Sequence, residues 1–373
     1  MKCSIVGLGT ALAPEIVSQA DALAMNSDVI CESDRQRRLL RTLFSKSGVS
    51  SRRTVIPCEL GYEWHQRDQA AASEVAVETV FGNGPTTGQR MELYRLHATP
   101  LALASATAAL HDAGVLPGDI THLVTVSCTG FAAPGVDIDL IRHLGLPSTT
   151  QRVHVGYMGC HGAINGLRTV QGLAANDPDA CVLMCCVELC SLHFRMQWEP
   201  DAIVGNALFA DGSGSLIAVG ENWGRENPHS DTICKIEATG ACLIEDTIDE
   251  MSWHIGDHGF EMRLTSAVPD SIEAYLKAWI SDWLDQQGLT IDEIQRWFVH
   301  PGGPRIIDAV QNALQLRDDQ VQVSRAVLNE LGNMSSATVL FVMQRNQAQP
   351  VRGPAVALAF GPGVMAEAAL LSF

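Results

Sequence analysis

The sequence predicts an α/β protein made of two halves that loosely repeat one pattern. Short apolar runs alternate with helical patterns in the first half, and a looser version of this alternation recurs in the second half. Hydrophobic residues make up 46% of the 373-residue chain and charged residues only 18%, which is typical of a compact globular enzyme. The alternation indicates helical layers packed on a largely buried sheet.

The first half opens with a predicted strand and turn in "MKCSIVGLGTALAP", where Gly7, Gly9 and Pro14 interrupt the apolar run. This opening is unlike a signal peptide. Strand and helix patterns then alternate. We expect a strand over 121–131, a helix over 136–146, a strand over 152–160, a helix over 161–177 and a strand over 180–189.

The second half repeats the pattern less regularly. We expect a helix over 271–288, a strand from 294 into a turn at 300–303, helices over 304–316 and 337–346, and a strand, loop and strand over 355–373. Gly, Asn and Pro gather in "GENWGRENPHSD" at 220–231. We therefore expect the halves to comprise residues 1–225 and 226–373.

Composition narrows the class of protein. A formal net charge of −17 argues against non-specific nucleic-acid binding, which requires a basic surface. No apolar run approaches the ~20 residues that span a bilayer, so we expect no membrane span. The eleven cysteines mostly lie inside apolar runs, which indicates reduced, buried thiols and a cytoplasmic location. Cys181, Cys185, Cys186 and Cys190 match no usual zinc spacing, and we expect no metal site.

Cys160 is a candidate nucleophile, because it stands in "YMGCHGAINGL" between a predicted strand and a predicted helix. Free N–H groups and the positive end of the helix dipole favour a thiolate there, so we expect the pKa of Cys160 to fall. Gly159 and Gly162 would let substrate approach closely. The alternative is a small buried residue that fills the joint between strand and helix.

Two further residues could complete a reactive site. His300 ends the apolar strand of "WFVHPGGP", where it could face a cavity as a general base or hydrogen-bond donor, or could be a satisfied core histidine. Asn333 in "ELGNMSSATVLF" could stabilise an oxyanion through its amide, or could simply cap the following helix.

Four blocks carry a resemblance to a known family: "GCHGAINGL", "HPGGPRIID", "GNMSSATVLF" and "FGPGVMAEAALL". Together with "GNALFADGSGSL", their order and spacing resemble the type III polyketide synthases, the chalcone synthase-like branch of the thiolase fold. The resemblance runs from about "RRTVIP" to the C-terminus. It implies a thiolase-like fold with two pseudo-duplicated halves in a layered αβαβα arrangement.

The implied reaction is a decarboxylative Claisen condensation. Cys160 would take an acyl starter from coenzyme A as a thioester, and His300 would hold the thiolate. His300 and Asn333 would bind the malonyl thioester and stabilise the enolate left by loss of carbon dioxide. Phe209 resembles the family's aromatic gatekeeper. Acyl-CoA and malonyl-CoA are the implied substrates, and no cofactor is expected.

The coenzyme's phosphates require cations, and "RQRRLLRTLFSKSGVSSRR" supplies a basic cluster in an acidic chain. The alternative is a solvated helix face. The resemblance places coenzyme A-binding cations here and implies Lys46, whereas Arg38 and Arg41 fit only with a one-residue offset. The backbone of Gly302 and Gly303 would border the pantetheine tunnel.

The residues expected to line the cavity differ from those of the plant enzymes. Met262 stands in place of a second gatekeeper phenylalanine, and Trp253 stands where plant enzymes often have glycine. His193 and Cys190 each replace a threonine that helps to shape the plant cavity. Ser335 is also expected in the cavity wall. Trp253 and His193 would limit or redirect chain extension. A large aromatic at the Trp253 position resembles the microbial alkylresorcinol and alkylpyrone synthases, which implies a long acyl starter and a resorcinol- or pyrone-type product.

Two other functions share these motifs. One is a single-condensation 3-ketoacyl synthase III-like enzyme, which uses the same nucleophile and differs in the number of extensions. The other is a non-catalytic thiolase-fold partner subunit, although such subunits commonly lose the three reactive residues. The resemblance also implies a homodimer, while Ala133 stands where relatives place a methionine that reaches the partner's cavity.

Overall fold

The computed structural model describes residues 3–74, 84–226, 232–347 and 352–373. Its strands are β1 (Cys3–Leu12), β2 (Glu15–Ser18), β3 (Ser51–Thr54), β4 (His122–Ser127), β5 (Gln151–Gly156), β6 (Cys181–Leu189), β7 (Asp211–Val219), β8 (Cys234–Leu243), β9 (Met251–Gly256), β10 (Gly259–Leu264), β11 (Arg296–Val299), β12 (Pro354–Gly361) and β13 (Met365–Ser372). Its α-helices are α1 (Gln19–Ile30), α2 (Asp34–Lys46), α3 (Glu59–Glu74), α4 (Thr87–Ala113), α5 (Val136–Leu144), α6 (Gly162–Asn176), α7 (Pro200–Leu208), α8 (Glu221–Glu226), α9 (Val268–Asp285), α10 (Pro304–Leu314), α11 (Asp318–Leu331) and α12 (Thr338–Gln347).

The sheet repeats one pattern in its two halves, which confirms the predicted pseudo-duplication. In the first half β4 is parallel to β6, and β7 is antiparallel to both β6 and β1. In the second half β11 is parallel to β12, and β13 is antiparallel to both β12 and β8. The halves meet where β1 pairs with β8. The nine strands therefore form a single sheet in the order β11-β12-β13-β8-β1-β7-β6-β4-β5.

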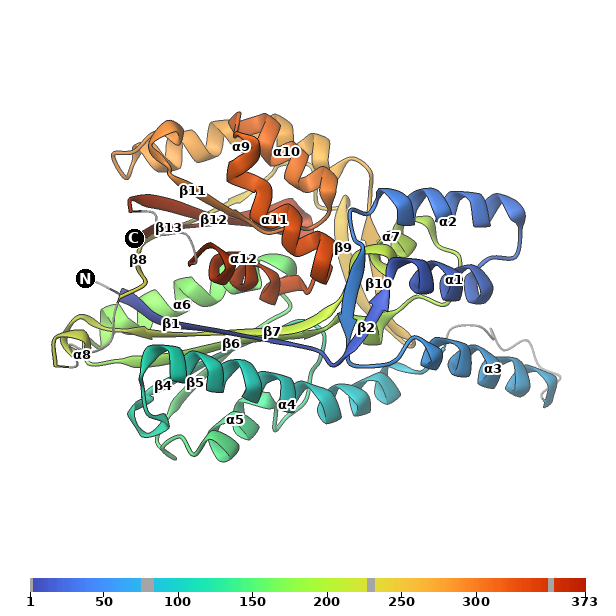
Figure 1. Cartoon of the computed structure of the whole chain (residues 1–373), viewed down its shortest axis with the longest axis horizontal. Helices are drawn as coiled ribbons and strands as arrows, with labels where there is room; N and C mark the ends of the chain where they lie inside the picture. Colours follow the sequence, from blue (N-terminus) through green and yellow to red (C-terminus); the bar gives the residue numbers. More distant parts are fainter. Residues whose placement is uncertain (1–2, 75–83, 227–231, 348–351) are drawn as a thin grey trace.

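The elements form the expected αβαβα layers (Figure 1). Helices α4 and α5 cover the outer face of the first half of the sheet, and α9 and α10 cover that of the second half. Helices α6 and α12 lie between the two halves, where their apolar residues form the central core. Helices α1, α2 and α7 and the β9–β10 hairpin gather at one end of these layers.

The expected strand over 152–160 ends earlier, at Gly156. The backbone turns at Tyr157 (φ 64°) and Gly159 (φ 75°), and Cys160 then lies in a 3₁₀ turn (Gly159–His161) that leads into α6. The sharp turn leaves Cys160 at the end of the strand rather than inside it. The order of the other expected helices and strands agrees with the structure, with ends shifted by a few residues.

The cysteines of β6 alternate between two cores, as strand geometry requires. Cys181 and Cys185 pack into the core under α4, and Cys186 packs into the central core. All eleven cysteines are free thiols. Among the described residues, no three His, Cys, Asp or Glu side chains group as metal ligands. None of the described helices is both long and apolar enough to cross a membrane.

The predicted boundary at 220–231 falls between β7 and β8, and its residues 227–231 lie outside the described residues. Because β1 and β8 pair across this boundary, the two halves share one sheet. The division into 1–225 and 226–373 stays a prediction.

Candidate active site

One cavity brings together the three reactive residues expected from the sequence. Cys160, His300 and Asn333 line it, although they follow three different strands or helices. Its volume is about 190 Å³, many times what one water needs. The site therefore has room for a ligand beside the thiol.

The turn that carries Cys160 is packed against the Gly-Pro-Gly loop between β12 and β13. A Cβ on Gly159 would lie 2.5 Å from Pro362 Cδ, and a Cβ on Gly361 would lie 2.2 Å from the His161 ring. Only glycine permits both the positive φ of Gly159 and this close approach. The "FGPG" block thus holds the Cys160 turn in place.

The predicted fall in the pKa of Cys160 is wrong for the thiol by itself. Burial raises its pKa to about 11, and hydrogen bonds from Ser335 and Asn333 lower it by less than burial raises it. The thiol faces the cavity but is otherwise enclosed by protein, and this desolvation outweighs the start of a helix. Thiolate formation therefore requires a nearby group that accepts the proton.

His300 is the residue expected to take this role. It is 1% exposed, follows β11 and lines the cavity. Neither of its ring nitrogens has a hydrogen-bond partner among the described residues. Burial, and to a smaller extent the nearby His161, lowers the pKa of His300 to about 3, so the ring is neutral. A buried imidazole with unused nitrogens indicates a function in binding or proton transfer.

Asn333 takes the capping role, and its side-chain amide also faces the thiol. Its Oδ1 accepts a hydrogen bond from Ser335 N at 2.8 Å and so caps a short 3₁₀ turn (Ser335–Ala337). This bond orients Nδ2 toward Cys160 Sγ (3.8 Å) and Gly302 O (3.4 Å). The amide donor consequently points at the space beside the thiol.

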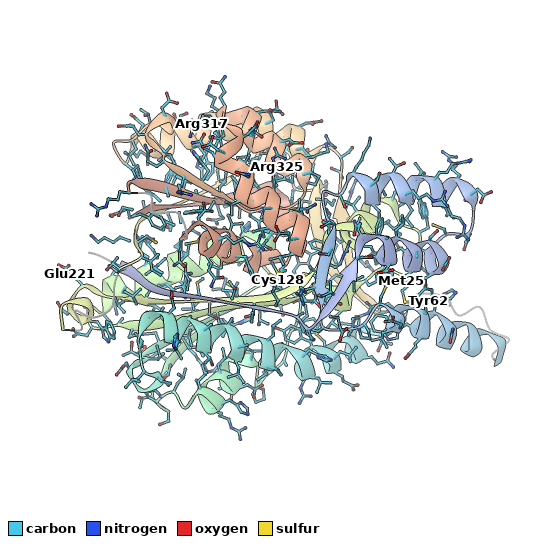
Figure 2. The ribbon with its side chains drawn as sticks, in the orientation of Figure 1. Met25, Tyr62, Cys128, Glu221, Arg317 and Arg325 are labelled. Atoms are coloured by element: carbon cyan, nitrogen blue, oxygen red, sulfur yellow. The ribbon has the colours of Figure 1, made fainter. Side chains whose placement is uncertain are left out.

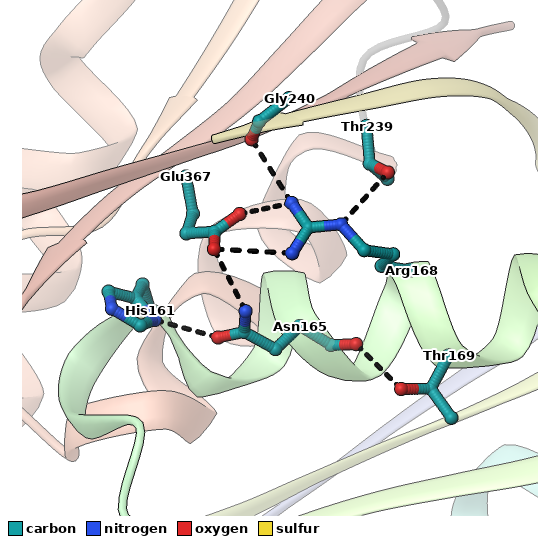
Figure 3. Close-up of polar contacts among 7 residues, drawn as sticks. All are labelled: His161, Asn165, Arg168, Thr169, Thr239, Gly240 and Glu367. Carbon is teal, nitrogen blue, oxygen red and sulfur yellow. Dashed lines mark hydrogen bonds and ion pairs between the residues drawn. The ribbon is translucent and has the colours of Figure 1, made fainter. Parts of the chain in front are cut away.

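A polar chain ties the Cys160 turn to the second half of the protein (Figure 3). Arg168 pairs with Glu367 on β13, and Asn165 Nδ2 donates to Glu367 Oε1 at 2.9 Å. This fixes the amide of Asn165, so its Oδ1 accepts from His161 Nδ1 at 2.7 Å. The residue that follows Cys160 is thereby anchored to the strand beside the Gly-Pro-Gly loop.

Phe209 and Met262 lie at the cavity, as the resemblance implied. Both approach Gly205 on α7, whose added Cβ would lie 3.0 Å from the Phe209 ring and 3.8 Å from Met262 Sδ. Arg52 donates to the carbonyl oxygens at the end of α7, including that of Phe209 at 3.2 Å. The buried Arg52 therefore holds the end of α7 that carries Phe209 rather than facing solvent with its basic neighbours.

An aromatic stack forms another part of the wall. The His193 and Phe260 rings are parallel, with centroids 3.6 Å apart, and Phe260 stacks on Trp253 at 4.4 Å. Trp253 pairs with Met262 across the β9–β10 hairpin. Phe260 was not expected from the sequence, although its place two residues before Met262 in a strand puts both on one face. Cys190 and Ser335 also line the cavity.

The cavity extends from the thiol toward α1 and α3. Figure 2 labels Cys128, which lines it beside the Cys160 turn, and Met25, which lines it from α1. The extension is mostly apolar, and its walls include Val17, Ala22, Met25, Ile56 and Trp64. None of these residues was predicted to be part of the site, because the cavity joins segments that are distant in the sequence.

The expected coenzyme-binding residues divide into two groups. Arg38, Arg41 and Lys46 are exposed on α2 and are not among the residues that line the cavity. Gly302 lines the cavity, whereas Gly303 begins α10 beside Leu208. The structure thus leaves the three cations at the surface.

Comparisons with known proteins agree with this arrangement. Residues 1–222 match the family model described as chalcone and stilbene synthases, N-terminal domain, and residues 236–372 match the C-terminal domain of the same family. The chain is 32% identical over 371 residues to 1,3,6,8-tetrahydroxynaphthalene synthase from Streptomyces peucetius subsp. caesius, with 99% of this chain and 92% of that protein covered. It is 29% identical over 371 residues to the alpha-pyrone synthesis polyketide synthase-like Pks18 of Mycobacterium tuberculosis (strain ATCC 25618 / H37Rv), with 98% and 90% covered.

Solved structures are similar over the whole chain. PKS-I from the brown alga Ectocarpus siliculosus has a TM-score of 0.87 at 30% identity, with 100% of this chain and 98% of that chain covered. The C-terminal type III polyketide synthase domain of Steely1 from Dictyostelium has a TM-score of 0.88 at 26% identity, with 100% and 99% covered.

Proposed function

Because the chain belongs to the chalcone and stilbene synthase family and is a type III polyketide synthase, an acyltransferase, we propose that Cys160 carries the acyl chain. His300 and Asn333 bind the malonyl thioester. The observation that carries this assignment is that the three side chains line one cavity, where neither ring nitrogen of His300 has a hydrogen-bond partner among the described residues.

The first step loads the starter from acyl-CoA. The Cys160 sulfur attacks the thioester carbonyl while the neutral His300 ring takes the thiol proton. The carbon–sulfur bond to coenzyme A then breaks, and the proton passes to the departing coenzyme thiolate. Proton acceptance by His300 is needed because burial raises the pKa of the Cys160 thiol to about 11.

The second step extends the chain with malonyl-CoA. His300 and Asn333 Nδ2 donate hydrogen bonds to the malonyl thioester oxygen, which becomes negative when carbon dioxide leaves. The enolate carbon attacks the acyl carbonyl on Cys160, a carbon–carbon bond forms, and the cysteine sulfur leaves. A site with little water strengthens both hydrogen bonds.

The apolar extension toward α1 and α3 supports a long acyl starter. An alkyl chain on Cys160 would be removed from water between Ala22, Met25 and Trp64, at about 0.8 kcal/mol for each buried CH₂. The similarity to a relative named for alpha-pyrone synthesis supports a pyrone- or resorcinol-type product.

Binding of coenzyme A and dimerisation complete the proposal. Lys46, Arg38 and Arg41 bind the coenzyme's phosphates, and the backbone of Gly302 and Gly303 borders the pantetheine. The homodimer forms through β5, an edge strand that exposes Val153 to solvent. An exposed strand edge with apolar side chains favours pairing with a second copy.

Mass spectrometry of the products from malonyl-CoA and a panel of acyl-CoA starters tests this function. Products with two or more malonyl-derived units are expected, whereas a single condensation would favour the 3-ketoacyl synthase III-like alternative. A Cys160→Ala protein should still release carbon dioxide from malonyl-CoA through His300 and Asn333, yet form no polyketide. Polyketide formation by this variant would overturn the assignment of Cys160.

A further inference from the structure

His193 lines the cavity and carries an unused hydrogen-bond acceptor, with no partner among the described residues. Its Nε2 lies 2.7 Å from the carbonyl oxygen of Thr129. A carbonyl oxygen only accepts, so Nε2 carries the hydrogen and Nδ1 of the neutral ring holds a lone pair. Nδ1 is buried and has no hydrogen-bond partner among the described residues, although the side chain lines the cavity.

The surroundings hold this acceptor in one position. Thr129 is fixed by Glu188, which accepts from Thr129 Oγ1 at 2.7 Å and from Thr129 N at 3.1 Å. The His193 ring is also held by its parallel stack on Phe260, with ring centroids 3.6 Å apart. A flip of the ring would break the bond to Thr129 and a tilt would break the stack, so Nδ1 keeps a defined direction.

The backbone that bears His193 is also held. Arg90 is fully buried and donates to the carbonyl oxygens of Leu192 at 2.5 Å and Phe194 at 3.1 Å. Burial, together with the charge of Arg90, lowers the pKa of His193 to about 3, although the hydrogen bond to Thr129 opposes this. The ring consequently stays neutral, and Nδ1 stays an acceptor, at any pH at which the enzyme works.

We propose that His193 Nδ1 accepts a hydrogen bond from the enol hydroxyl of a β-keto unit in the growing chain on Cys160. This inference rests on the proposed function. Each malonyl unit adds a β-keto group, and its enol form carries the O–H donor that this acceptor requires. An enol held in one place presents its nucleophilic carbon in one direction, so His193 determines which carbon closes the ring.

Two substitutions distinguish the roles of the two ring nitrogens of His193. His193→Gln places an amide N–H where Nε2 lies, so it keeps the bond to Thr129 and removes the acceptor. His193→Asn can place its Oδ1 where Nδ1 lies, so it keeps the acceptor and loses the bond to Thr129. Both proteins are assayed with malonyl-CoA and a saturated acyl-CoA, whose alkyl chain has no O–H or N–H donor of its own.

The readouts are the ratio of cyclised to shorter, derailed products by mass spectrometry and the melting temperature Tm. His193→Gln should lower the product ratio about two- to tenfold, the value of one neutral hydrogen bond, with little change in Tm. His193→Asn should keep the product ratio and lower Tm. An unchanged ratio in His193→Gln, or the same fall in both variants, would overturn the proposal. A wild-type protein that makes no polyketide would instead contradict the proposed function.

Discussion

Asn333 Nδ2 lies 3.8 Å from Cys160 Sγ, although 173 positions separate the two residues in the sequence. The repeated topology explains this proximity. Cys160 precedes α6 and then β6, and Asn333 precedes α12 and then β12, which are corresponding elements of the two halves. Both helices lie between the halves of the sheet, so their first residues meet at one cavity.

Asn333→Ala should slow the decarboxylation of malonyl-CoA about 10²- to 10³-fold, because one of the donors to the developing enolate is lost. The Cys160→Ala background isolates this step, and carbon dioxide release measures it. Asn333→Asp is the matched variant, since it keeps the acceptor for Ser335 N but has no N–H donor. It should lose at least as much activity, and near wild-type rates in either variant would refute the role of Nδ2.

His300→Gln should slow the alkylation of Cys160 by iodoacetamide at pH 7. Without the imidazole, no neighbouring base takes the proton of a thiol whose pKa is raised by burial. Labelling followed by mass spectrometry from pH 6 to 10 should show the rate in the variant rising about tenfold per pH unit. Equal rates in wild type and variant at pH 7 would mean that His300 does not accept the proton.

His300 should also make the fold sensitive to acid. Its pKa is about 3 in the folded protein, against the ordinary histidine value of 6.5. Between these values the unfolded state binds the additional proton, so stability is lost as pH falls below about 6.5. From pH 7 to pH 5 the unfolding free energy of wild type should fall by about 2 kcal/mol more than that of His300→Gln. Urea unfolding at the two pH values measures this, and parallel losses would contradict it.

Much of the site could be predicted because local patterns encode it. Cys160 was expected between a strand and a helix, and short apolar runs predict the buried strands β4 and β6. The pKa of Cys160 could not be predicted, because desolvation depends on how completely other segments enclose the thiol. The direction of the free lone pair on His193 could not be predicted either. It depends on the carbonyl of Thr129, 64 positions away, and on the ring of Phe260 in the β9–β10 hairpin.

Trp253→Gly should lengthen or alter the product, because the indole fills the wall between Phe260 and Met262. Trp253 is half-buried, so the loss of its packing also costs some stability, and Tm should be measured alongside the product profile. His254→Gly is the control, since His254 is exposed on the other face of the same strand. An unchanged product profile in Trp253→Gly would show that the indole does not limit chain extension.

Ala22→Phe should reduce activity with long acyl-CoA starters and spare short ones. Ala22 is buried on α1 and lines the apolar extension of the cavity, so a phenyl ring there would occupy the space proposed for the far end of an alkyl chain. A starter that loses contact for three CH₂ groups would lose about 2 kcal/mol of binding, or about thirtyfold in kcat/KM. Ala24→Phe is the matched control, because Ala24 lies two positions along the same helix and is exposed. The measurement is kcat/KM for starters of increasing length with each variant. Equal losses for short and long starters, or the same selectivity in Ala24→Phe, would show that the extension does not hold the acyl chain.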